Sequence, residues 1–241
     1  MRENEELKTA LRGIETRVAN ANATSEETER LLYALGHDLR TPLRTISAYA
    51  QLLDRQSALN SEAREMTSFI VKAADEMKML IEDLLKYSRI APSPPRTQTA
   101  LGPVLQWAAL NLQTAFKESG AQLETGDLPE LVVNEAQFVQ LFEQLLSNAI
   151  KFRGANTPHI EVSAEESEDG YLISVRDNGM GIEPQFHEIV FAPFKRLHGK
   201  EIPGSGLGLS ICRKIVRAHG GRIWIESEPH QGAAVRFHIP N

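Results

Sequence analysis

Apolar residues recur along the first 56 residues at the alternating steps of three and four that define a coiled-coil seam. Leu32, Leu35 and Leu39 fix the register. The seam continues upstream through Leu7, Leu11, Ile14, Val18, Ala21, Ser25 and Thr28. The pattern predicts a helix over residues 2–56, which is too long to be stable alone and must pair. In this register His37 lies outward, away from a partner helix.

A second helix is predicted from Asn60 or Ser61 to about Ile90, after a turn over residues 55–60. Its apolar positions are Ala63, Met66, Ile70 (or Phe69), Ala73, Met77, Leu80, Leu84 and Tyr87. Two such helices form a hairpin, and two hairpins form a four-helix bundle. We therefore expect a parallel homodimer through residues 1–90. A monomeric hairpin packed on the rest of the chain is the alternative.

Residues 91–98 (APSPPRTQ) are rich in proline and carry no period, which indicates a linker. Beyond them the pattern mixes both element types. Helices are predicted over 101–118, 135–152 and 204–219, and strands over 122–124, 131–133, 159–164, 171–176, 222–226 and 234–239. This order, with an antiparallel type of sheet, indicates an α+β two-layer sandwich. The expected fold is therefore an all-α hairpin followed by a sandwich.

Composition narrows the class of protein. The 26 Lys and Arg against 32 Asp and Glu give a net charge of −6, which argues against binding to nucleic acid or to an anionic membrane. Cys212 is the single cysteine and suits a reducing compartment. No apolar run approaches the roughly 20 residues that span a bilayer. We expect a soluble, cytoplasmic chain, and a helix that begins in mid-heptad suggests a further module upstream.

Polar residues line one flank of the helix predicted over 135–152. Gln144, Asn148 and Lys151 fall on this flank. The carboxamide oxygen of Asn148 could ligate Mg²⁺, with Lys151 nearby for phosphate. A solvated asparagine is the alternative.

Two glycine-rich stretches follow. Asp177, Gly179 and Gly181 lie in DNGMGI, where the backbone can approach a flat ligand and the carboxylate can accept from an amino group such as that of adenine. A plain glycine turn is the alternative. The other stretch is GSGLGLS, with Gly204, Gly206, Leu207 and Gly208.

Glycine-rich backbone at a helix start is suited to phosphate, as in GSGLGLS. The stretch lacks the Gly-Lys-Ser/Thr of a Walker loop, and no parallel βαβ unit surrounds it. The segment before it contains Lys195 and Arg196 and suits a mobile lid over a polyphosphate. Phe191 and Phe194 belong either to this lid or to the core.

Five motifs resemble, in order, the H, N, G1, F and G2 boxes of two-component sensor histidine kinases. They are GHDLRTPL, NAIKF, DNGMGI, FAPFKRL and GSGLGL. The resemblance runs from about Glu27 to Ile239 and is closest in wording to kinases of the bacterial phytochrome type. It implies a coiled-coil signalling helix (1–30), a dimerisation and phosphotransfer hairpin (31–90) and, after the linker, a Bergerat-type ATP-binding domain (99–241).

The resemblance also implies the chemistry. ATP with Mg²⁺ would phosphorylate His37, with Asp38 orienting the ring and accepting its proton. The phosphoryl group would pass to an aspartate of a response regulator. Thr41 could orient water to dephosphorylate that regulator, or be a plain surface hydroxyl.

Further roles follow for the ATP domain. Asn148 would hold the metal, Asp177 and Gly181 would bind adenine, and the backbone from Gly204 to Gly208 would bind phosphate. Lys151, Lys195 and Arg196 would spread the phosphate charge.

One position departs from the family pattern. Gln144 stands where these kinases often have Asn and where the related ATPases have a general-base Glu. Glutamine cannot take a proton from water, so we expect little independent ATP hydrolysis. A nucleotide-binding scaffold without catalysis, and an ATP-driven clamp, remain as alternatives.

Overall fold

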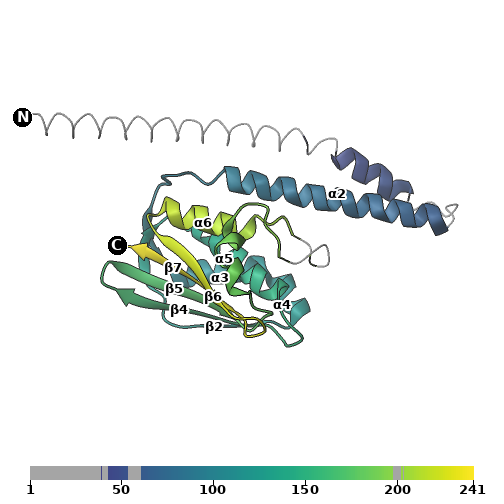
Figure 1. The fold of residues 1–241 in the computed structure, drawn as a ribbon. Helices are drawn as coiled ribbons and strands as arrows, with labels where there is room; N and C mark the ends of the chain where they lie inside the picture. The colour runs from purple at the N-terminus through teal and green to yellow at the C-terminus, as the bar shows by residue number, and fades with distance from the viewer. Residues whose placement is uncertain (1–38, 40–42, 54–60, 198–201, 203) are drawn as a thin grey trace, which may run out of the picture. The chain divides into compact units, whose positions relative to one another are not determined.

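The computed structural model describes residues 39, 43–53, 61–197, 202 and 204–241. The chain divides into two compact units, Met1–Arg89 and Ile90–Asn241 (Figure 1). The sequence-predicted residues His37, Asp38 and Thr41 lie outside the described residues. Within the described part of the chain, none of the helices has the length and apolarity required to cross a membrane.

The first unit contains two described helical stretches, residues 43–53 and α2 (Ser61–Ser88). The second of these matches the helix predicted from the sequence. Leu43, Ala74, Ile81 and Leu85 form its buried apolar cluster. The predicted apolar stripe lies beside this cluster, and much of it is exposed in the single chain: Met66 by 58%, Ile70 by 47%, Met77 by 47% and Leu80 by 37%. Helix α2 therefore carries two adjacent apolar faces, of which one is uncovered.

The second unit is built on a five-stranded sheet in the order β2-β4-β5-β7-β6. Its strands are β2 (Gln122–Thr125), β4 (His159–Ser167), β5 (Gly170–Asp177), β6 (Arg222–Ser227) and β7 (Ala233–Pro240). β2 and β4 pair in parallel, and the other neighbours are antiparallel. The sheet is therefore mixed, whereas the sequence indicated an antiparallel type.

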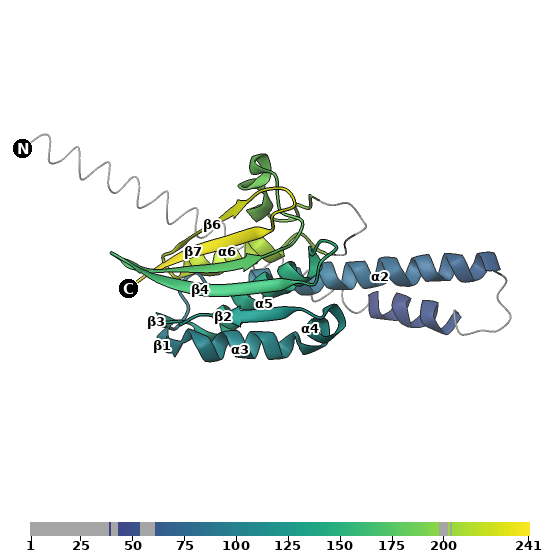
Figure 2. The same cartoon turned by 90° about the horizontal axis from the view of Figure 1, so that it is seen from below.

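Four helices make the second layer and cover one face of this sheet (Figures 1 and 2). They are α3 (Leu101–Asn111), α4 (Gln113–Ser119), α5 (Glu135–Lys151) and α6 (Gly208–Ala218). Phe138 and Phe142 of α5 pack edge-on against Phe237 of β7, with ring centroids 6.4 and 6.2 Å apart. The predicted two-layer arrangement is confirmed.

Two predicted helices differ in their bounds. The one predicted over 101–118 is interrupted at Leu112, whose N–H turns back to the carbonyl of Ala109 (3.1 Å). The one predicted over 204–219 begins at Gly208, because Gly206 has φ +73°, a left-handed conformation that a right-handed helix excludes.

The segment expected as a linker, 91–98, runs into β1 (Thr97–Ala100), which pairs antiparallel with β3 (Glu130–Val133). Side-chain bonds also hold this segment on the second unit. The Arg96 guanidinium donates to the carbonyl of Ala218 (2.7 Å), and the Asn134 amide donates to the carbonyl of Pro95 (2.8 Å). Residues 95–100 therefore have a fixed position on the sandwich.

Candidate functional site

Helix α5 turns its polar flank toward the glycine-rich stretch that leads into α6. A Cβ built on Gly208 would lie 2.8 Å from Gln144 Oε1 and 3.7 Å from Asn148 Oδ1. A Cβ on Gly204 would collide with Lys151 Nζ. The carboxamides of Gln144 and Asn148 and the ammonium of Lys151 therefore lie next to glycine backbone just before and at the start of α6. This arrangement suits a ligand with several negatively charged oxygens.

The start of α6 is shaped by a tight turn. The hydroxyl of Ser205 accepts from the N–H of Leu207 (3.1 Å), and the Leu207 side chain is fully buried. The left-handed Gly206 lies against the backbone of Phe194 and Lys195, since a Cβ there would be 2.8 Å from the Phe194 carbonyl carbon. The turn therefore joins the predicted lid to the helix start.

Strand β5 ends at Asp177, which organises the DNGMGI stretch. Its Oδ1 accepts from the N–H of Gly179 (2.8 Å) and from the N–H of Ala233 at the start of β7 (3.2 Å). The N–H of Met180 donates to the carbonyl of Phe152, just after α5 (2.9 Å). This loop is thus fixed to both α5 and the β6–β7 hairpin.

The environment of Asp177 also affects its ionisation. Burial raises the pKa of this carboxyl above its ordinary value, and the bonds from Gly179 and Ala233 oppose that rise only in part. The carboxylate therefore takes up a proton at a higher pH than an exposed aspartate does. Any ligand that needs the ionised form loses affinity from that higher pH downward.

The lid segment divides into a buried and an exposed part. Phe191 is 3% exposed and packs in the core, with the Arg213 guanidinium 6.0 Å from its ring centroid, whereas Phe194 is 57% exposed at φ +61°. Lys195 is exposed, and Arg196 donates to the carbonyl of Ile202 (2.8 Å). Of the two phenylalanines, only Phe191 is therefore a core residue.

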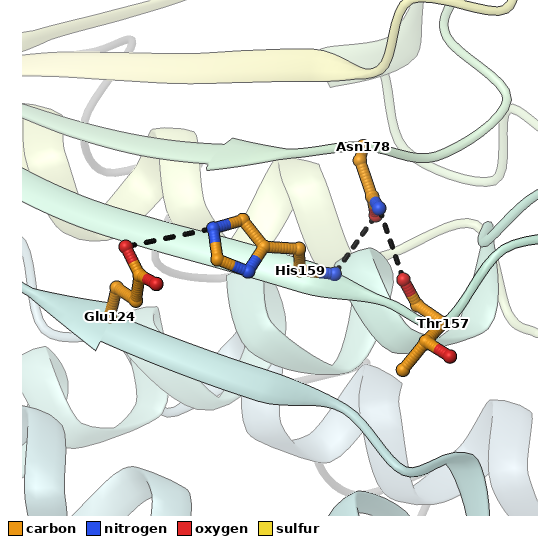
Figure 3. Close-up of polar contacts among 4 residues, drawn as sticks. All are labelled: Glu124, Thr157, His159 and Asn178. Atoms are coloured by element: carbon orange, nitrogen blue, oxygen red, sulfur yellow. Dashed lines mark hydrogen bonds and ion pairs between the residues drawn. The ribbon is translucent and has the colours of Figure 1, made fainter.

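Asn178 is a site residue that the sequence reasoning did not single out (Figure 3). Its Nδ2 donates to the carbonyl of Thr157 (3.0 Å), and its Oδ1 accepts from the N–H of His159 (2.9 Å). The ring of His159 reaches across to Glu124 on β2, at 3.7 Å between Nε2 and Oε2. Asn178 thus fixes the start of β4 beside Asp177. No local sequence signal marked Asn178, because its two partners lie 19 and 21 residues away in the chain.

Among the predicted binding residues, the structure brings Asn148, Lys151, Gly204 and Gly208 together, with Asp177 in a loop attached to the end of the same helix. Residues 27–93 match the family described as His Kinase A (phospho-acceptor) domain, and residues 133–241 match the family described as histidine kinase-, DNA gyrase B- and HSP90-like ATPase. The chain belongs to the sensor histidine kinase family.

Its relatives include phytochromes, as the resemblance indicated. The chain is 37% identical over 92% of its length to the phytochrome-like protein Cph1 of Synechocystis sp.. It is 41% identical over 90% of its length to cyanobacterial phytochrome A of Nostoc sp.. It covers only 30% and 29% of these two proteins.

One similar solved structure contains AMPPNP. Full-length ShkA in complex with AMPPNP is similar over 88% of this chain and 45% of ShkA, with a TM-score of 0.67 and 26% identity. The fold and the ATP-binding class of the second unit are therefore those of histidine kinases.

Proposed function

We propose that the chain is a catalytic core that transfers the γ-phosphoryl group of ATP to His37 and then to an aspartate of a response regulator. The observation that carries the proposal is the meeting of Asn148 and Lys151 with the glycine backbone at the start of α6. An amide, an ammonium and glycine backbone that lie close together support this proposal, because a triphosphate is bound by groups of these kinds.

The nucleotide is held at two ends. Asp177 accepts a hydrogen bond from the adenine amino group, with the backbone at Gly179 and Gly181 against the ring. Lys151 and the backbone from Gly204 through Gly206 and Leu207 to Gly208 bind the phosphates.

Further groups complete the phosphate end. Lys195 and Arg196 add positive charge when the lid closes. Asn148 would hold Mg²⁺, and the ion would neutralise charge on the phosphates. Two carboxamides facing the helix start fit that ion, because amide oxygens are among its ligands.

The reaction itself follows from the chemistry of imidazole. One ring nitrogen of neutral His37 attacks the γ-phosphorus in line, and the bond to the β,γ-bridging oxygen breaks as ADP leaves. The proton on the other ring nitrogen passes to Asp38. Gln144 cannot activate water, so transfer to histidine is favoured over hydrolysis.

Dimerisation through residues 1–90 accompanies this function. In the single chain, the uncovered face of α2 carries Met66, Phe69, Ile70, Met77 and Leu80. Exposed apolar side chains on one helix face favour association with a second copy. The second copy would complete a four-helix bundle.

Three further proposals rest on family membership. An upstream sensor would set the activity, a receiver domain would accept the phosphoryl group, and Thr41 would orient water in a phosphatase reaction. We place the kinase in the cytoplasm, where ATP and response regulators meet.

Incubation of the full chain with γ-labelled ATP tests the proposal. We expect an acid-labile, alkali-stable label that is absent from His37→Gln and from Asn148→Ala. His159→Gln, which changes a ring that faces Glu124 on β2 and keeps the backbone N–H that donates to Asn178, should keep the label. Binding of ATP with no label at any pH would favour a non-catalytic scaffold, and sustained phosphate release without a phosphoenzyme would favour an ATP-driven clamp.

A further inference from the structure

The β6–β7 hairpin forms hydrogen bonds with both ends of the DNGMGI loop. Ser227 and Ala233 are cross-strand partners at the end of the β6–β7 ladder. The N–H of Ala233 donates to Asp177 Oδ1 (3.2 Å), at the start of the loop. The hydroxyl of Ser227 accepts from the N–H of Ile182 (2.8 Å), at its end. One cross-strand pair therefore sets the span of the loop.

The Ser227 hydroxyl makes two hydrogen bonds in this arrangement, one as acceptor and one as donor. Besides accepting from Ile182, it donates to the carbonyl of Gly232 (2.7 Å), in the turn of the hairpin. Gly232 in turn lies directly against the Asp177 carbonyl, and a Cβ there would collide with that oxygen. The middle of the loop is also tied, since the N–H of His230 donates to the carbonyl of Met180 (2.7 Å). The hydroxyl thus joins the hairpin turn, the loop end and the neighbourhood of Asp177.

We infer that Ser227 is a positioning residue for base recognition, acting through Asp177 rather than touching the nucleotide. The inference rests on the proposed function, in which Asp177 binds the adenine amino group. Without the hydroxyl, the Ile182 N–H and the Gly232 carbonyl lose their partner, and the hairpin turn is released from the loop. The carboxylate then loses its fixed direction, while the phosphate end of the site at Lys151 and Gly204 keeps its own contacts.

The test compares the full chain with Ser227→Ala and Ser227→Thr for binding of ATP and of ITP by calorimetry. ITP carries a carbonyl oxygen in place of the adenine amino group, so the exocyclic group that faces Asp177 is an acceptor instead of a donor. For Ser227→Ala we expect about tenfold weaker ATP binding, as for the loss of one or two buried hydrogen bonds, and ITP binding within about twofold of the wild type. Threonine keeps the hydroxyl and should restore the preference for ATP. Ser174→Ala, which removes a hydroxyl from the middle of β5, is the matched control and should change neither affinity.

Each result has one meaning. Equal losses for both nucleotides would show a general structural role and overturn the inference, as would unchanged ATP binding or a failure of threonine to restore it. A wild-type chain that binds no ATP would instead overturn the proposed function itself.

Discussion

In the proposed function, base recognition depends most directly on Asp177. Its Oδ1 is occupied by two backbone N–H groups, from Gly179 and Ala233. The second oxygen remains for the nucleotide. An amide at this position would keep its oxygen on the two backbone donors and turn its NH₂ toward the adenine amino group, which is also a donor.

Asp177→Asn is therefore expected to weaken ATP binding by at least roughly tenfold, because a charged hydrogen bond is replaced by two opposed donors. Calorimetric titration of the full chain with ATP measures the effect. Asp127→Asn, an exposed change in the loop before β3, should leave the affinity unchanged. Wild-type affinity in Asp177→Asn would contradict the assignment of adenine to this carboxylate.

His219 is a second residue whose surroundings fix its state. Its Nε2 accepts from the N–H of Asn134 (3.0 Å), so Nδ1 carries the proton and donates to the carbonyl of Ile215 (2.8 Å). Burial lowers the pKa of this imidazole, the bond to Ile215 opposes the shift, and the charge of Arg96 adds to it. The neutral form therefore stabilises the native state.

The sign of the pH dependence follows. The unfolded chain takes up a proton near its ordinary pKa, about 6.5, before the folded chain does. The contribution of His219 to the free energy of unfolding is complete above that pH. It is lost as the pH falls toward the lowered pKa of the imidazole in the folded chain. Urea unfolding measures the free energy of unfolding at pH 8 and at pH 5. Between these two pH values, the wild type should lose more of this free energy than His219→Gln does, by up to about 1.4 kcal/mol per pH unit in the affected range. The same loss of free energy of unfolding in both proteins would contradict this role of His219.

At the scale of elements, the start of α6 depends on the turn at Gly206. A side chain there would suffer a left-handed φ of +73° and a contact with the backbone of Phe194. The left-handed conformation alone costs roughly 1–2 kcal/mol for other residues.

Gly206→Ala is therefore expected to lower the free energy of unfolding by at least that amount and to weaken ATP binding. Chemical denaturation and calorimetry measure the two effects. Gly102→Ala is the matched control, because a Cβ at that helical glycine meets nothing within 4 Å. It should be neutral or stabilising by up to about 1 kcal/mol. Equal effects of the two changes would contradict the role given to the turn.

Helices and strands could be predicted where the apolar residues recur with a clear helical or strand period. The apolar faces of α2 and α5 and the alternation in β4, β5 and β7 placed those elements to within a few residues. The parallel pairing of β2 with β4 could not be predicted, because residue types specify pairing partners only weakly. Strand β1 lay in a proline-rich stretch that lacks alternation. Asn178 and Ser227 were not predicted because their partners are backbone groups far away in sequence.

At the scale of the whole molecule, we propose that two chains associate through the exposed apolar face of α2. Ile70 lies in the middle of that face, and Lys72 lies on another side of the helix. A carboxylate at position 70 would have to be buried unpaired in the bundle.

Ile70→Glu should therefore produce a monomer, with the dimer weakened by roughly 100-fold or more, since burying an uncompensated charge costs several kcal/mol. Lys72→Glu, which places a carboxylate on the opposite side of α2, should remain dimeric. Light scattering after size-exclusion chromatography at several concentrations distinguishes the two. A wild-type chain that is monomeric throughout would support the alternative of a hairpin that acts alone.

The central claim is that a nucleotide held at the glycine-lined start of α6 phosphorylates the histidine of the first unit. The most direct measurement is mass spectrometry of the full chain after incubation with ATP and Mg²⁺, with digestion and separation at alkaline pH to preserve a phosphohistidine. We predict one phosphorylated residue, His37, and no phosphopeptide when Asn148→Ala replaces the wild type. A phosphoryl group on any other residue, or its persistence at the same yield in Asn148→Ala, would contradict the account.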